Sequence, residues 1–197
     1  SEDVDDTYNM ISVDGDTSTN DTVLVLANGM AGNETIQEGT EAYEIFREAL
    51  HAVNEYLAKK IAGDGEGATA LFEVHVVGAE TKEAAVKLAK SVACSNLTKT
   101  AIAGHDANWG RIICAMGYSG AQFDPEKVDL FFESEAGKIQ IAENGVALDF
   151  SEEKATEILS QSVVTATADV KMGNQEATAW GCDLTHGYIE INADYRS

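Results

Sequence analysis

Three short polar stretches of the chain carry the side chains best suited to chemistry. The first is the segment 14–21, Asp-Gly-Asp-Thr-Ser-Thr-Asn-Asp, which holds three carboxylates. Clustered oxygens suit a hard cation, but the spacing lacks the glycine and the glutamate that an EF-hand loop needs. Because Asp, Asn, Ser and Thr also stabilise turns through bonds to their own backbone, the composition favours a structured turn over a metal site.

The second stretch is the loop 64–69, in which Glu66 stands between Gly65 and Gly67. Flanking glycines let a backbone approach a ligand closely, so the carboxylate can meet an ammonium group. The same pattern is typical of an ordinary turn between a helix and a strand. The pattern alone favours the turn.

The third stretch is the segment 104–111, which brings together a His, an Asp, an Asn and an Arg. A Cys–His dyad with Cys94 or Cys114 can be drawn, but the spacing gives it little support. Asp106 is more simply explained as a helix cap. The chain has no serine-hydrolase elbow, zinc-protease or P-loop motif, so none of the three stretches makes a complete active site.

Composition limits the partners of this chain. It has 197 residues and a formal net charge of −21, which disfavours nucleic acid and anionic membranes as partners. The 44% hydrophobic and 24% charged residues are those of a globular protein. The three cysteines lie far apart with no CxxC pair, which predicts reduced thiols in a cytoplasmic protein.

Hydrophobic periodicity predicts the elements that position the three stretches. A long helix follows the cap Thr40, and shorter helices are expected at 81–93, 107–116 and 152–160. Apolar runs and alternation predict strands at 8–13, 22–27, 71–77, 99–103, 128–132, 138–141, 146–150, 162–170, 176–182 and 188–192, with a hairpin turn at Asn144-Gly145. This mixture predicts an α+β fold of mixed sheets with packed helices.

The long helix carries an apolar stripe at helical spacing. Its members are Ala42, Ile45, Phe46, Ala49, Val53, Tyr56 and Leu57.

Four segments together resemble the signatures of a known family. They are residues 11–22, residues 64–69, Lys99-Thr100-Ala101 with residues 104–111, and the terminus 191–197, Ile-Asn-Ala-Asp-Tyr-Arg-Ser. In this order they resemble the ornithine acetyltransferase family, also called the bifunctional glutamate N-acetyltransferases of arginine biosynthesis.

The resemblance implies an acyltransferase made as one precursor that cleaves itself before a threonine. That threonine takes an acetyl group from N-acetylornithine and passes it to glutamate. No metal or prosthetic group is expected. The α and β chains are expected to pair as a cytoplasmic α2β2 heterotetramer.

This sequence resembles the β-chain part of the Ntn-like ornithine acetyltransferase fold. We expect residues 1–38 to supply strands to a catalytic domain shared with the α chain, residues 39–104 to form a central α/β domain, and residues 105–197 a C-terminal α+β domain. The family's nucleophile stands in an Ala-Thr-Met-Leu context that is missing here. No residue of this chain is therefore expected to be catalytic, and the chain alone is expected to be inactive.

Three family substrate contacts fall on residues of this chain: Glu66, Asn192 and Ser197. A carboxylate can bind the α-ammonium of an amino acid, while an amide and a hydroxyl orient its other polar groups. The substrate carboxylate would then need a positive partner, which we expect from outside this chain.

Two other functions remain open. One is a non-catalytic module that keeps the amino-acid pocket, and the other is an Ntn-like aminopeptidase. Ser1 offers a further alternative, because a terminal serine can act as a nucleophile with its own α-amine as the base.

Overall fold

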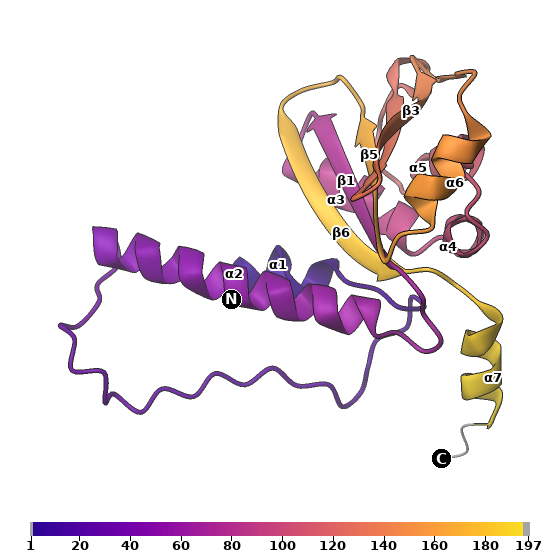
Figure 1. Cartoon of the computed structure of the whole chain (residues 1–197). Helices are drawn as coiled ribbons and strands as arrows, with labels where there is room; N and C mark the ends of the chain where they lie inside the picture. Colours follow the sequence, from indigo (N-terminus) through magenta and orange to yellow (C-terminus); the bar gives the residue numbers. More distant parts are fainter. Residues whose placement is uncertain (1, 195–197) are drawn as a thin grey trace.

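A six-stranded mixed sheet forms the centre of the structure, a computed structural model that describes residues 2–194 (Figure 1). The strand order is β4-β3-β2-β5-β1-β6. The neighbours β1 and β5 pair in parallel, and every other neighbouring pair of the sheet is antiparallel. The strands are β1 Leu71–Ala79, β2 Asp129–Ser134, β3 Gly137–Glu143, β4 Val146–Ala147, β5 Val163–Asp169 and β6 Gln175–Cys182. The predicted α+β class is confirmed.

Polar residues cap the starts of several helices. They are α1 Glu2–Asp5, α2 Glu41–Gly63, α3 Lys82–Ala93, α4 Asn96–Ala103, α5 Trp109–Gly117, α6 Glu152–Leu159 and α7 His186–Asp194, with 3-10 turns η1 Tyr8–Met10 and η2 Pro125–Lys127. Thr40, Thr81 and Ser151 each accept a hydrogen bond from a backbone N–H in the first turn of α2, α3 and α6, respectively. Among the described residues, no helix is long and apolar enough to cross a membrane.

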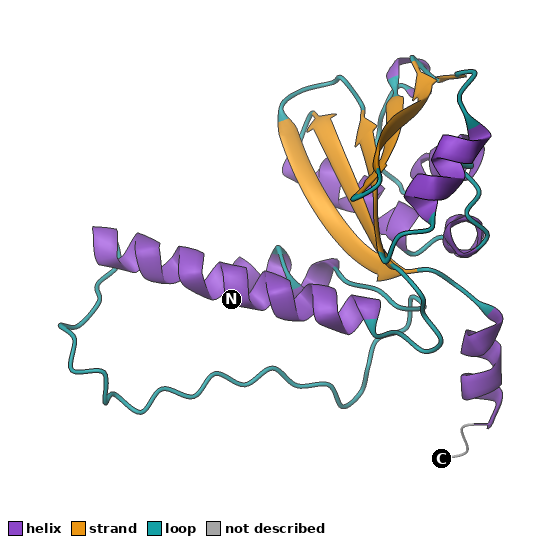
Figure 2. Ribbon diagram, viewed as in Figure 1, coloured by secondary structure: helices purple, strands orange, loops and turns teal. Residues whose placement is uncertain are grey.

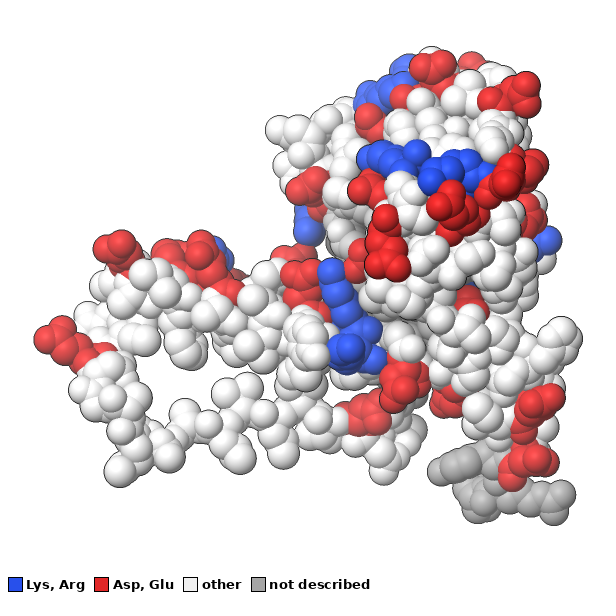
Figure 3. All heavy atoms as spheres, viewed as in Figure 1, with Lys and Arg blue, Asp and Glu red and all other residues white. Residues whose placement is uncertain are grey.

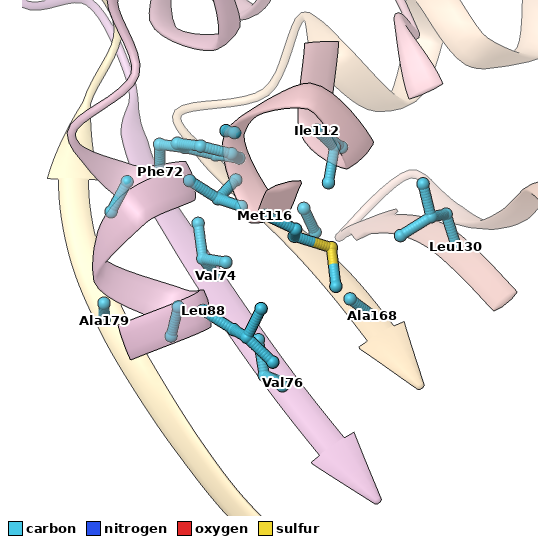
Figure 4. Close-up of a cluster of buried hydrophobic side chains, with 14 of the residues drawn as sticks. Phe72, Val74, Val76, Leu88, Ile112, Met116, Leu130, Ala168 and Ala179 are labelled. Carbon is cyan, nitrogen blue, oxygen red and sulfur yellow. The ribbon is translucent and has the colours of Figure 1, made fainter. Parts of the chain in front are cut away.

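The core lies between the sheet and the helices on one of its faces (Figure 2). Phe72, Val74 and Val76 alternate along β1 and are buried, as the period of two predicts. They point toward α3 and α5, where Leu88 and Met116 fill the space between the layers (Figure 4). This packed layer is the rigid body on which the polar stretches are mounted.

Two helices and one long segment extend away from this body. In Figure 1, α2 runs outward from the foot of the sheet, and α7 descends from the end of β6. Between η1 and α2, residues 12–39 contain neither helix nor strand. Most residues of these three parts therefore lie outside the packed core.

Four predicted strands are wrong. Residues 99–103 belong to α4, and residues 188–192 belong to α7. Residues 8–13 form a 3-10 turn followed by a single bridge from Ile11 to Trp180, and residues 22–27 are not in a strand. Short apolar runs do not distinguish a strand from a buried helix, and Ser95 caps α4 by accepting from Thr98 N.

The division into three domains at residues 38 and 104 stays a prediction. The central sheet takes β1 from before residue 104 and its other five strands from after it. The parallel neighbour of β1 is β5, at Val163–Asp169, and not the strand predicted at 99–103.

Candidate functional site

The Glu66 loop lies directly against the start of α7. Gly67 has a φ of +70°, and a Cβ added there would stand 2.5 Å from the carbonyl carbon of Gly187. The hydroxyl of Thr185, just before α7, donates to the carbonyl of Gly67 at 2.7 Å. Only glycine leaves room for this close approach, and the Thr185 hydrogen bond holds the loop beside the helix that carries Asn192.

A buried aspartate fixes the C-terminal end of the same loop. Asp183, which is 3% exposed, accepts from Thr69 N at 2.7 Å, from Thr69 Oγ1 at 2.6 Å and from Ala70 N at 3.0 Å. These three donors compensate the burial of a polar group. Two contacts thus tie the loop to the segment that follows β6, and both are made by residues just after Glu66.

Glu66 and Asn192 both lie at the surface of this chain. No side-chain hydrogen bond or ion pair of Glu66 occurs within residues 2–194, so its carboxylate is available to a ligand. Asn192 donates to the carbonyl of Tyr188, one turn earlier in α7, at 3.0 Å. Ser197 lies outside the described residues. The substrate-binding roles of all three residues stay predictions.

The Asp14 region forms the predicted turn. Asp14 Oδ1 accepts from Asp16 N at 2.9 Å, and Ser18 Oγ accepts from Asp21 N at 3.0 Å. These are the local side-chain to backbone bonds that define such turns. Within residues 2–194, no group of three His, Cys, Asp or Glu side chains is placed to hold a metal ion.

The same carboxylate also reaches α7. Tyr188 Oη donates to Asp14 Oδ2 at 2.8 Å. The hydrogen bond to Asp14 raises the pKa of Tyr188 to about 12, while the Asp16 N–H is the main cause that lowers the pKa of Asp14. The first and second signature segments therefore lie beside the start of α7, the helix that leads into the fourth segment.

Sequence reasoning missed a buried lysine behind this place. Lys99 is 1% exposed, and its ammonium donates to the carbonyl of Val13 and lies 3.6 Å from Cys182 Sγ. Burial raises the pKa of the Cys182 thiol, and the nearby Lys99 acts in the opposite direction. The single charged residue in the segment 97–102, Leu-Thr-Lys-Thr-Ala-Ile, is the signal in the sequence that points to such an internal contact.

The segment 104–111 supports the helix that carries Lys99. Arg111 Nη1 donates to Leu97 O at 2.7 Å and to Thr100 Oγ1 at 3.1 Å, which holds α4 against α5. The cap of α5 is Asn108, which accepts from Arg111 N, so the predicted cap at Asp106 is wrong. Asp106 instead accepts from the Asn108 amide at 3.0 Å.

The Cys–His dyad gains no support from the structure. His105 Nδ1 lies 3.4 Å from Ser160 Oγ, and no hydrogen bond joins it to a cysteine within residues 2–194. All three cysteines are free thiols. The third stretch is therefore part of the scaffold.

Comparison with known proteins decides the family. The sequence model of the ArgJ family matches residues 1–197. The chain belongs to the ArgJ family. It is 58% identical over 98% of its length to the arginine biosynthesis bifunctional protein ArgJ of Thermotoga neapolitana, and 53% identical over 98% of its length to that of Caldanaerobacter subterraneus.

The chain corresponds to part of the ArgJ sequence. It spans about half the length of these relatives, 49% and 48% respectively. A crystal structure of ArgJ from Bacillus halodurans matches it with a TM-score of 0.93 and 46% identity, over 98% of this chain and 90% of that one. The solved ArgJ chain is thus similar in extent to the one described here.

Proposed function

We propose that this chain is the β-chain portion of a glutamate N-acetyltransferase. The enzyme would move an acetyl group from N-acetylornithine to L-glutamate in the cytoplasm, through an acyl-threonine intermediate. The observation that carries the proposal is the 58% identity to an ArgJ protein across 98% of the chain. The contact between the Glu66 loop and the start of α7 supports it, because α7 carries Asn192, the second expected substrate contact.

Glu66 is proposed to bind the α-ammonium group of the amino acid. Its carboxylate is exposed and lies next to two residues that fixed contacts hold, Gly67 and Thr69, which suits a charge-assisted hydrogen bond to a ligand. Asn192 and Ser197 are proposed to orient the remaining polar groups of the substrate. This chain would therefore hold the amino acid rather than perform the covalent step.

The covalent step is proposed to use a threonine outside this sequence. The threonine hydroxyl would attack the acetyl carbonyl of N-acetylornithine, and the amine of ornithine would leave with the proton. The amine of glutamate would then attack the threonine ester, giving N-acetylglutamate and restoring the hydroxyl. Since no threonine of this chain lies in an Ala-Thr-Met-Leu context, we expect the chain alone to be inactive.

The apolar stripe of α2 supports an α chain as the partner. Its residues point away from the rest of this chain, and Ile45, Phe46 and Val53 are 61%, 53% and 54% exposed. The opposite face of α2 buries Asn54, Ala58 and Ala62. A helix with one apolar face exposed to water indicates a missing partner.

The segment 22–33 supports the same partner. It contains no charged residue, and Leu24 and Leu26 are 77% and 93% exposed. Figure 3 shows it as a mostly uncharged strip that stands apart from α2. An extended apolar stretch with unpaired backbone suits addition to the edge of another sheet. We propose that the α chain supplies that sheet within an α2β2 assembly.

Activity of the two-chain protein tests the proposal. Co-expressed with the α-chain half of its precursor, the chain should transfer labelled acetyl from N-acetylornithine to glutamate, and alone it should not. Glu66→Ala should raise KM for glutamate about tenfold to a hundredfold, because a charged hydrogen bond contributes about 1.5–3 kcal/mol. Glu80→Ala, which removes an exposed glutamate from the turn between β1 and α3, is the matched control.

Each outcome has one meaning. Absence of transfer by the two-chain protein would overturn the proposed reaction. Transfer with an unchanged KM in Glu66→Ala would remove Glu66 from the pocket and leave the reaction in place. Amide hydrolysis without transfer to glutamate would favour the aminopeptidase alternative.

A further inference from the structure

The helix α7 has little to hold it in place. None of its residues is buried, and Ile189 and Ile191 are 65% and 48% exposed. Yet this helix carries Asn192 and leads to the C terminus, where two of the three expected substrate contacts lie. Its orientation relative to Glu66 must therefore be fixed by a small number of contacts.

One side-chain contact is placed to fix that orientation. Within residues 2–194, the only hydrogen bond from a side chain of α7 to another element joins Tyr188 Oη to Asp14 Oδ2 at 2.8 Å. The partners are 174 positions apart in the chain. The Tyr188 carbonyl accepts from the Asn192 amide, so the residue that contacts Asp14 also orients Asn192.

The position of the Asp14 carboxylate is fixed, although the residue lies in an exposed turn. The preceding carbonyl, that of Val13, accepts from the buried ammonium of Lys99. Ser12 N donates to Trp180 O at 2.9 Å, which attaches the same turn to β6. The second oxygen of Asp14 accepts from Asp16 N. The turn is thus anchored by two bonds, to Lys99 of α4 and to Trp180 of β6, and is held in shape by one bond of its own.

We propose that the Asp14–Tyr188 hydrogen bond positions α7, and with it Asn192, against the Glu66 loop for binding of the amino-acid substrate. Tyr188 and Asp14 are positioning residues, since neither is required to touch the substrate. This inference rests on the proposed function and adds two residues to it. A hydroxyl that donates to a carboxylate makes a short, directional contact, which suits this role.

The test is a kinetic comparison in the two-chain enzyme. Tyr188→Phe removes only the hydroxyl, and we expect KM for glutamate to rise about fivefold to thirtyfold, with kcat at saturating substrate within about twofold. Asp14→Ala should have the same effect, and Asp14→Asn, which keeps an acceptor oxygen, should recover most of the loss. The double variant Tyr188→Phe/Asp14→Ala should be no worse than the worse single variant.

Two controls separate the possible outcomes. Tyr118→Phe removes a hydroxyl from a tyrosine that is 62% exposed near the end of α5, and it should leave KM unchanged. A KM unchanged in Tyr188→Phe but raised in Glu66→Ala would overturn the positioning role and leave the proposed function standing. Additive effects of Tyr188→Phe and Asp14→Ala would also overturn it, because the two residues would then act separately.

Discussion

The Tyr188 hydroxyl is expected to respond to pH in a defined window. Its hydrogen bond to Asp14 raises its pKa from 10.0 to about 12, so the folded state favours the protonated phenol. The bond therefore stabilises the fold in full below pH 10, and this contribution is lost as the pH rises from 10 to about 12.

Ultraviolet titration of tyrosinate checks this. The difference between the wild-type and Tyr188→Phe spectra should contain one transition near pH 12. Subtraction is needed because burial also raises the pKa of Tyr8. A difference spectrum that titrates at pH 10, the ordinary value for tyrosine, would mean that the hydroxyl does not donate to Asp14 in solution.

At the scale of elements, the contact between the 64–69 loop and α7 depends on Gly67. Gly67→Ala would place a Cβ at 2.5 Å from a backbone carbon and would also keep a φ of +70°. We expect α7 to move away from the loop, so that KM for glutamate rises about tenfold or more while the core stays folded.

A second glycine separates the two effects of Gly67→Ala, which are the contact of the new Cβ with α7 and the strain of a positive φ. Gly120 has a φ of +78°, and a Cβ added there would meet nothing within 4 Å. Gly120→Ala should therefore cost about 1–2 kcal/mol of unfolding free energy, measured by urea denaturation, with KM unchanged. Equal KM values for the two variants would show that the contact of Gly67 with α7 has no role in binding.

Local signals in the sequence predicted much of the fold, and long-range contacts account for most of the errors. Caps at Thr40, Thr81 and Ser151 and the hairpin at Asn144-Gly145 act within a few residues, so they could be predicted. Residues 99–103 are too short a segment for periodicity to separate a strand from a helix, and only the distant acceptor at Val13 explains why Lys99 is buried in a helix.

The candidate site shows the same difference between local signals, which can be predicted, and long-range contacts, which cannot. Glu66 and Asn192 were predicted because their segments resemble family signatures. The contacts that place them are made by Thr185, Asp183 and Tyr188, which bind residues more than 100 positions away. Neither periodicity nor spacing carries information on such pairs.

At the scale of the whole molecule, the exposed apolar surface of α2 predicts where the proposed α chain binds. Phe46 is 53% exposed and belongs to the stripe, so Phe46→Asp would place a charge in the proposed interface without disturbing the core of this chain. Co-expressed with the proposed α chain, the tagged variant should lose at least about nine-tenths of the partner that the wild type co-purifies.

Glu48→Ala is the matched control for this substitution. It alters an exposed residue of the same helix outside the apolar stripe, and it should retain the partner. Thermal unfolding of each two-chain preparation shows whether the variant itself is folded. Normal co-purification by Phe46→Asp would mean that the α chain binds elsewhere and that another surface covers α2. Loss of the partner in Phe46→Asp, with the partner retained in Glu48→Ala, would place the stripe in the interface with the proposed α chain.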